Sequence, residues 1–431
     1  MPQDTTAYNE VLKVVVEPGI RELIPTKVKT LKLFEEKEAR SWGGRYVEKV
    51  LNVGRNQGSG WGSEMGNVPT AGQDRFTNAK ILMRYQYGRL QLSAQVMKAS
   101  QGSKFSAEDA LEGGMRRLIK SMSSQRGRAI MGDGRGVICY VNETTPSGNT
   151  TVVVDSPGGF AGADNGARFI NPGQIIGFVN PSTGALRASN RTVQSVAANG
   201  TSFVVDSAPA AAVADNDYVV TVMTTGSTDV SDSSYQKEIM GLVGNIDDGT
   251  YVATPHGVNR TTYPSFQSTV ISNAGAWSAD VIQRAIDLAD QRGDGKIDRL
   301  IMHHSGRRAY IASMEDLRRY TGADLSKPDG GTVAAKQGTL SFGSIPIDEE
   351  KFAPYGMVFG CDTSTFQRYV EVAGEWADEG GSILQPVGSG STRQDAYEAL
   401  YRIWDQCFVE EPAASFRVDG LSVSLAVAHI D

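Results

Sequence analysis

Histidines, cysteines and paired carboxylates are the side chains that could carry chemistry at neutral pH, and this sequence has few of them. It contains four histidines and three cysteines in 431 residues. His303 and His304 are adjacent, and neighbouring side chains of a strand point to opposite faces, so the two cannot bind one metal ion from a strand. The pair therefore predicts structural histidines rather than a metal centre or an acid–base site.

One group of acidic residues resembles the start of a calcium loop. Asp290, Asp294 and Gly295 have the spacing of such a loop, but Arg292 stands at its third position and Ile301 at its twelfth, where a bidentate Glu is needed. We therefore predict a turn between a helix and a strand.

A second acidic group comprises Glu143, Asp155 and the run Asp215-Asn216-Asp217. It lies in a region rich in turn residues, where acidic side chains usually cap Asx turns. A glycosidase needs two carboxylates across a cleft, and a sequence does not show such a cleft. We predict turn caps here.

The cysteines Cys139, Cys361 and Cys407 are odd in number and lack a CxxC spacing, which argues against a disulfide framework and a zinc knuckle. Synthesis in a reducing cytoplasm fits this usage. The sequence has no nucleophile elbow, Walker loop or dinucleotide fingerprint, and no Cys has a neighbouring His. We expect no enzyme activity, no cofactor and no metal.

Charge and hydropathy exclude two further classes of protein. The net charge is −7 and no block of Lys and Arg stands out, so specific nucleic-acid binding is not predicted, and DNA would be met only as contents of a container. Residues 1–10 do not form a signal peptide, and no apolar run reaches about 18 residues. We expect neither secretion nor a membrane span.

The elements that would position functional residues begin with an arm and a hairpin. Residues 11–34 are interrupted by Pro18 and Pro25, which prevents a long helix and predicts an arm. Strands are expected at 44–53 and 79–96, joined by a Gly-, Ser- and Asn-rich loop. Since so long a loop has no core of its own, we predict a hairpin that projects and packs against a neighbour.

The rest of the chain predicts an α+β protein of two or three packed units. A helix is expected from Ser106 to just before Gly132, and short strands follow at 150–154, 174–179, 192–196, 202–205 and 218–222, typical of a small β sandwich or barrel. Later elements are expected as a helix at 278–292, a strand at 297–302, a helix capped by Ser305 through 319, a strand at 357–359, a helix at 394–404 and an alternating segment at 421–427.

This order of parts resembles the HK97-type major capsid proteins of tailed bacteriophages. The resemblance is most specific in four segments: Gly54-Arg55-Asn56, Gly62-Ser63-Glu64, Pro69-Thr70-Ala71-Gly72-Gln73, and residues 84–95 (RYQYGRLQLSAQ). These are similar to the E-loop and the beginning of the spine region in that family. The strand at 297–302 followed by a capped helix is similar to part of the family's axial domain.

The resemblance implies an HK97-like division of the chain. Its parts would be an N-terminal arm at 1–43, an E-loop hairpin at 44–98, the spine helix and start of the peripheral domain at 99–136, an inserted β-rich domain at 137–225, and the axial domain with the rest of the peripheral domain at 226–431. The residues expected to contact another subunit are Arg55, Trp61, Glu64, Pro69, Tyr85 and Tyr87.

The family also implies a function and partners. The chain would assemble in the host cytoplasm through pentamers and hexamers into the icosahedral capsid of a virion that encloses double-stranded DNA, contacted non-specifically, with a scaffolding protein, a portal and a decoration protein as further partners. Two alternatives remain open. One is an encapsulin-like compartment that packages cargo enzymes; the other is a carbohydrate-binding or hydrolytic phage accessory protein, suggested by the β-rich region.

Overall fold

The computed structural model describes most of the chain: residues 30–38, 46–54, 56–96, 106–187, 190–209, 211–224, 226–321, 340–378, 382–388 and 393–423. The expected arm up to residue 29 and the end of the alternating segment, 424–427, lie outside the described residues. No described helix is long and apolar enough to cross a membrane.

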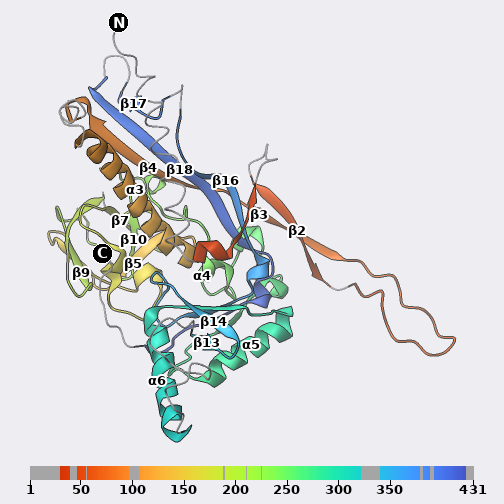
Figure 1. The fold of residues 1–431 in the computed structure, drawn as a ribbon. Helices are drawn as coiled ribbons and strands as arrows, with labels where there is room; N and C mark the ends of the chain where they lie inside the picture. Colours follow the sequence, from red (N-terminus) through yellow and green to blue (C-terminus); the bar gives the residue numbers. More distant parts are fainter. Residues whose placement is uncertain are drawn as a thin grey trace.

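A mixed five-stranded sheet runs along the upper part of the molecule (Figure 1). Its central strand β18 (Ala396–Val409) pairs on one edge with β4 (Arg84–Ser93) and on the other with β16 (Phe366–Trp376) and the short β17 (Gln385–Pro386). The strand β1 (Glu35–Glu38) adds to β16 in parallel.

The helix predicted at 394–404 is wrong, because residues from Ala396 onward form the strand β18. Its side chains alternate between the two faces, with Ala399, Tyr401 and Ile403 buried in sequence on one of them. Ala, Glu and Leu in this segment favour a helix when considered alone. Pairing with a neighbour on each edge overrides that propensity, because a two-residue period then buries a whole face.

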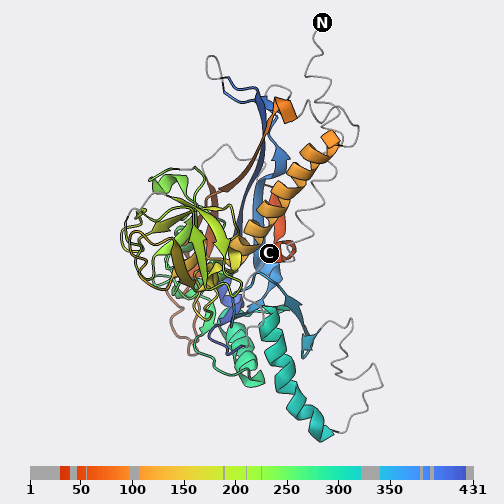
Figure 2. The ribbon, with the colours of Figure 1, turned by 90° about the vertical axis from the view of Figure 1, so that its left-hand side faces the viewer.

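The helix α3 (Ser106–Met131) has the predicted bounds and packs on one face of this sheet (Figures 1 and 2). Met115, Ile119 and Met122, spaced by four and three residues, pack onto the face of β18 that carries Tyr401. Gly88 of β4 permits the close approach of helix to sheet, because a Cβ there would come within 2.3 Å of the Met122 sulfur.

A second sheet of six strands forms the lower part of the molecule. In spatial order its strands are β11 (Thr269–Ile271), β19 (Phe416–Val418), β15 (Val358–Cys361), β12 (Arg299–Met302), β14 (Ile345–Glu349) and β13 (Ser341–Phe342). The helix α5 (Ala279–Gly293) buries Ile282, Ala285 and Ala289 against it. The predicted helix at 278–292 and strand at 297–302 are thus confirmed within two residues.

The helix α6 (His304–Thr321) begins one residue before Ser305, the residue predicted to cap it. Ser305 lies inside the helix, and its backbone N–H donates to the His303 Nδ1 at 3.1 Å. The imidazole of His303 therefore takes the place expected for the serine hydroxyl, satisfying one of the free N–H groups at the start of the helix.

Between α3 and the rest of the body the chain forms a closed β barrel. Its strands are β5 (Val137–Val141), β6 (Thr151–Asp155), β7 (Ile175–Val179), β8 (Arg191–Val196), β9 (Ser202–Val205) and β10 (Tyr218–Thr221). Five of them coincide closely with the strands predicted from sequence. Inward side chains such as Val152, Phe178 and Phe203 are fully buried and give the barrel its own core.

In the described parts of the chain, the connections include the short helix α4 and several 3-10 turns. They are α4 (Leu242–Asn245), η1 (Thr30–Leu33), η2 (Pro157–Gly159), η3 (Gly166–Phe169), η4 (Val230–Asp232), η5 (Pro255–Gly257), η6 (Pro264–Phe266), η7 (Thr363–Thr365) and η9 (Pro412–Ala414).

Candidate assembly surface

A two-stranded hairpin projects from the body on the side away from the barrel (Figure 1). The strands β2 (Val47–Gly54) and β3 (Arg75–Ile81) pair antiparallel, with an irregularity between Asn52 and Gly54. Beyond the strands the loop continues outward without further strand pairing through residues 56–74. The projecting hairpin predicted from sequence is present, with its second strand starting earlier than expected.

The hairpin tip, residues 56–73, has no core beneath it. Trp61 and Met65 are as exposed as in an extended chain, at 106% and 103%, and Val68 is 87% exposed. Glu64 and Pro69 are exposed as well. Apolar side chains this large rarely stand free in solution, and a cluster of them marks a contact with another molecule.

The base of the hairpin, in contrast, packs on its own chain. Ala79, Ile81 and Met83 are buried against Phe266 and Phe408. The prediction that the hairpin from residue 44 to residue 96 packs against a neighbour is therefore wrong for its lower half, which packs on its own chain. Only the outer loop and the distal ends of its strands lack intramolecular support.

The hairpin also ends earlier than predicted, because the chain leaves it at Leu82. The following strand β4 belongs to the five-stranded sheet and pairs with β18 over its whole length. Tyr85 and Tyr87 lie on one face of β4, as their two-residue spacing predicts, and they are 54% and 49% exposed. Tyr85 packs edge-on against Trp404, with ring centroids 5.4 Å apart.

The six expected contact residues thus fall into two groups. Trp61, Glu64 and Pro69 lie on the hairpin tip, whereas Tyr85 and Tyr87 lie on the sheet. Arg55 lies outside the described residues. The structure does not bring the two groups together within one chain.

A cleft of about 350 Å³ opens between β4, α3 and the end of the barrel. Its lining comes from the start of β4, including Arg84 and Gln86, from α3, and from Met223, which follows β10 and is 61% exposed. The Tyr85 and Tyr87 side chains point to the other face of the sheet, because Gln86 and Gly88 face α3. Sequence reasoning assigned the two tyrosines to the hairpin and did not find this cleft.

The floor of the cleft carries a buried ion network. Asp405 of β18 forms ion pairs with Arg126 of α3 and with Arg368 of β16, the latter at 2.6 Å. Burial alone would raise the pKa of Asp405, but the two guanidinium groups hold it below its ordinary value. Asp405 Oδ1 and Arg126 Nε nevertheless have no hydrogen-bond partner.

Arg84 adds a third buried polar atom without a partner to the same cleft. Its Nε is enclosed and forms no hydrogen bond, and its guanidinium makes no ion pair within the described parts of the chain. Burial lowers the pKa of Arg84. A guanidinium nitrogen that loses water without gaining an acceptor costs stability.

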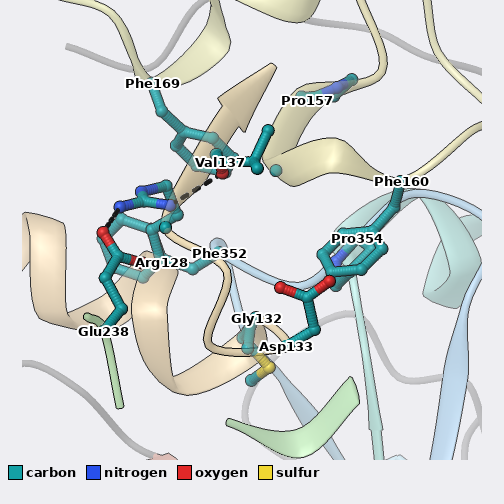
Figure 3. A pocket seen from close by; sticks show the side chains of 13 residues that line it. Arg128, Gly132, Asp133, Val137, Pro157, Phe160, Phe169, Glu238, Phe352 and Pro354 are labelled. Atoms are coloured by element: carbon teal, nitrogen blue, oxygen red, sulfur yellow. Dashed lines mark hydrogen bonds and ion pairs between the residues drawn. The ribbon is translucent and has the colours of Figure 1, made fainter. Parts of the chain in front are cut away.

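Beside the cleft, contacts of Arg128 connect the barrel to the body (Figure 3). Arg128 at the end of α3 donates to the Val137 carbonyl at 3.0 Å and pairs with Glu238, as the dashed lines show. The cavity that these residues line holds only about 10 Å³, room for about one water molecule. It is therefore a packing gap and not a binding site.

Arg168 makes a second joint between barrel and body. This fully buried side chain donates to the carbonyls of Lys351 and Ala353 and stacks on the Tyr355 ring at 4.3 Å. Asn165 donates to the Tyr355 hydroxyl at 3.1 Å. The barrel is thus held in a fixed place against the body.

His303, His304 and the apparent calcium loop make local structural contacts. The Nδ1 atoms of His303 and His304 contact different partners, Ser305 and Glu349. Asp294 ends α5 in the left-handed conformation, with its N–H donated to the helix, which confirms the predicted turn.

Asp217, from the other acidic group, and the cysteines are structural as well. Asp217 accepts a hydrogen bond from the Ala214 N–H at 2.8 Å and pairs with Arg187, so it caps a turn as predicted. All three cysteines are unpaired and buried. Within the described ranges no three His, Cys, Asp or Glu side chains could hold a metal ion.

Comparison with solved structures shows which known fold this architecture resembles. A chain of the cyanophage A-1(L) capsid matches with a TM-score of 0.51, at 9% identity, over 88% of this chain and 88% of that chain. This chain has the fold of a phage capsid protein. The expected capsid fold is therefore confirmed, and the mixed helices and strands agree with the predicted α+β class.

Two further structures match at lower scores. The capsid of the native GTA particle gives a TM-score of 0.45 at 9% identity, over 92% of this chain and 90% of that chain. The SrpI encapsulin complex of Synechococcus elongatus PCC 7942 gives 0.43 at 9% identity, over 94% and 92%. No protein-family model and no curated protein matches the sequence.

Proposed function

We propose that this chain is the major capsid protein of a tailed bacteriophage. In this role it would assemble through pentamers and hexamers into an icosahedral shell that encloses double-stranded DNA. The observation that carries the proposal is the hairpin tip, where Trp61, Met65 and Val68 stand exposed on a chain with the capsid fold. Such a tip becomes ordered and useful when it buries its apolar side chains on an adjacent subunit.

Under this proposal each part of the molecule takes the role of one part of an HK97-type subunit. The hairpin of β2 and β3 would be the E-loop, α3 the spine helix, the five-stranded sheet the peripheral domain, the six-stranded sheet with α5 and α6 the axial domain, and the barrel an insertion. One change from the division proposed on sequence follows from β4, which belongs to the peripheral sheet and not to the E-loop.

A shell also fits the charge of the chain. A net charge of −7 without a basic block suits a container that meets DNA non-specifically. A scaffolding protein, a portal and a decoration protein would be the further partners, and assembly would take place in the host cytoplasm.

Negative-stain microscopy of the expressed full chain, alone and with its scaffolding partner, tests the proposal. We expect closed shells tens of nanometres across. Small soluble oligomers under every condition would overturn it. Shells purified from infected cells should contain DNA and a portal; shells that hold a cargo enzyme and no DNA would instead establish the encapsulin-like alternative.

A further inference from the structure

Four polar side chains meet at the base of the hairpin, where β2 contacts β16 and the end of β18. Lys49 comes from β2, Gln367 and Tyr369 come from β16, and Glu410 follows β18. The Lys49 Nζ pairs with Glu410 Oε1, and the Gln367 side-chain N–H donates to the same oxygen. The Tyr369 hydroxyl donates to the Gln367 carbonyl oxygen at 2.9 Å. An amine, a carboxylate and an amide are therefore held together.

The alternation of the two strands directs these groups to one place. Lys49 stands at an inward position of β2, between Val47 and Leu51, which both pack on the apolar cluster of the hairpin base. Gln367 and Tyr369 are two residues apart on β16, so they project from the same face. They are only 4% and 9% exposed. Water therefore reaches the amide poorly, whereas the lysine amine is directed towards it.

We propose that Lys49 and Gln367 join in an isopeptide bond within one chain. The Lys49 Nζ attacks the side-chain carbonyl carbon of Gln367, a C–N bond to Nζ forms, and the C–N bond to Nε2 breaks. Starting from the ammonium form of Lys49, the products are the new amide and one ammonium ion, so atoms and charge balance. The fold holds the two side chains side by side, which replaces an encounter between separate molecules.

Glu410 and Tyr369 supply the two catalytic functions that this step requires. The carboxylate of Glu410 contacts both nitrogens, so it can relay the two protons that Nζ loses to the leaving Nε2. Negative charge develops on the Gln367 carbonyl oxygen when the amine adds to the carbon. The Tyr369 hydroxyl is already hydrogen-bonded to that oxygen and stabilises the charge. The reaction takes place once in each chain.

The bond fastens the hairpin to the five-stranded sheet. It joins β2 to β16, so the base of the hairpin keeps its position on the body through a covalent link as well as through apolar packing. Both partners belong to one chain, and the bond therefore needs no second subunit. The inference goes beyond the proposed shell function and does not depend on it.

Intact-mass spectrometry of the denatured full chain tests the bond. We expect a mass lower by one ammonia than the mass calculated from the sequence. A tryptic digest should contain a branched peptide that joins the segments around Lys49 and Gln367, because trypsin does not cleave after a lysine whose Nζ is acylated. The calculated mass, with Lys49 and Gln367 found in separate peptides, would overturn the proposal.

The variant Lys49→Arg removes the nucleophile but keeps a positive charge beside Glu410, because a guanidinium group stays protonated. Its mass should match the calculated value, and the branched peptide should be missing. Lys80→Arg, at an exposed position of β3 in the same hairpin, is the matched control and should still lose one ammonia. A loss of ammonia that persists in Lys49→Arg would have another source, such as an Asn-Gly sequence, and would overturn the proposal.

The variants Tyr369→Phe and Glu410→Gln test the two catalytic roles. Newly synthesised chains are labelled in a short pulse, and the joined fraction is followed over time. Each variant should form the bond at least about 100-fold more slowly than the native chain. Native rates in both variants would overturn these roles. Urea denaturation of the unjoined variants shows whether the subunit is folded, which separates a slow reaction from a folding defect.

The outcomes separate this inference from the proposed function. The bond is expected in the unassembled monomer, whether or not the chain forms shells. A bond that appears only in particles and joins two chains, seen as a dimer band in denaturing electrophoresis, would overturn the inference that it forms within one chain. An unjoined chain that assembles into closed shells would leave the shell function standing and remove only this inference.

Discussion

The barrel and the hairpin tip both extend from the same body, but they differ in what stabilises them. Every barrel strand has two hydrogen-bonded neighbours, and side chains such as Phe178 fill its interior. The tip has exposed apolar side chains, and its hydrogen bonds to described residues are local, such as the Gly66 N–H donated to the Ser63 carbonyl. The barrel therefore folds on intramolecular contacts, whereas the tip needs another molecule.

The largest expected effect lies in the barrel core. Phe178→Ala should lower the free energy of unfolding of the unassembled subunit by about 3–5 kcal/mol, because it leaves a cavity in a fully buried site. Urea denaturation measures this change. Phe76→Ala in the hairpin, where the ring is 61% exposed, is the matched control. Equal losses for both variants would contradict the contrast between barrel and hairpin.

The free energy of unfolding should depend on pH because of a residue at the hairpin base, where packing is intermediate between barrel and tip. His256 is buried beside Phe408. Burial, with Arg260 and Arg84 nearby, lowers its pKa to about 3. In the unfolded state the pKa of His256 is ~6.5, so the unfolded chain binds the proton first as the pH falls. Stability should decline below about pH 6.5 and continue to decline towards pH 3, by at most ~1.4 kcal/mol per pH unit for this group.

The variant His256→Asn isolates this contribution. Asn tolerates the left-handed backbone of residue 256, whose φ is 49°. Urea midpoints measured at pH 7 and pH 5 should differ less in the variant than in the native chain. An unchanged difference would show that other groups dominate the acid sensitivity.

The smallest effect on subunit stability is expected at the tip itself. Trp61→Ala should change the free energy of unfolding by less than about 0.5 kcal/mol, since the indole has no intramolecular contact to lose. Particle yield, measured by sedimentation, should nevertheless fall. A comparable loss of melting temperature would mean that the tip packs on its own chain.

Sequence patterns predicted the elements whose stability is local. The helix α3 has its apolar residues at helical spacing, and the barrel strands are short runs between turn residues, so both were predicted with close boundaries. The break between β3 and β4 was missed because no Gly or Pro marks Leu82 and Met83. The strand β18 was missed because its two neighbours, rather than its own residues, decide its conformation.

The candidate assembly surface, too, was predicted from the sequence only in part. Trp61, Glu64 and Pro69 were found because a long loop without a core is visible in the sequence. The cleft was not, because Arg84, Arg126 and Asp405 come from β4, α3 and β18, which only the folded chain brings together. A buried nitrogen without a hydrogen-bond partner, such as Arg84 Nε, has no sequence pattern, since burial and pairing are properties of the fold.

The register of the barrel has a practical consequence. Val137 at the start of β5 pairs with Val220 near the end of β10, so the chain enters and leaves the barrel about 5 Å apart. A module whose two ends lie that close can be exchanged for another without stretching the body. A foreign domain inserted between residues 136 and 222 would have to cover Tyr355, on which Arg168 now stacks. With that surface covered, the subunit could display the foreign domain in place of the barrel.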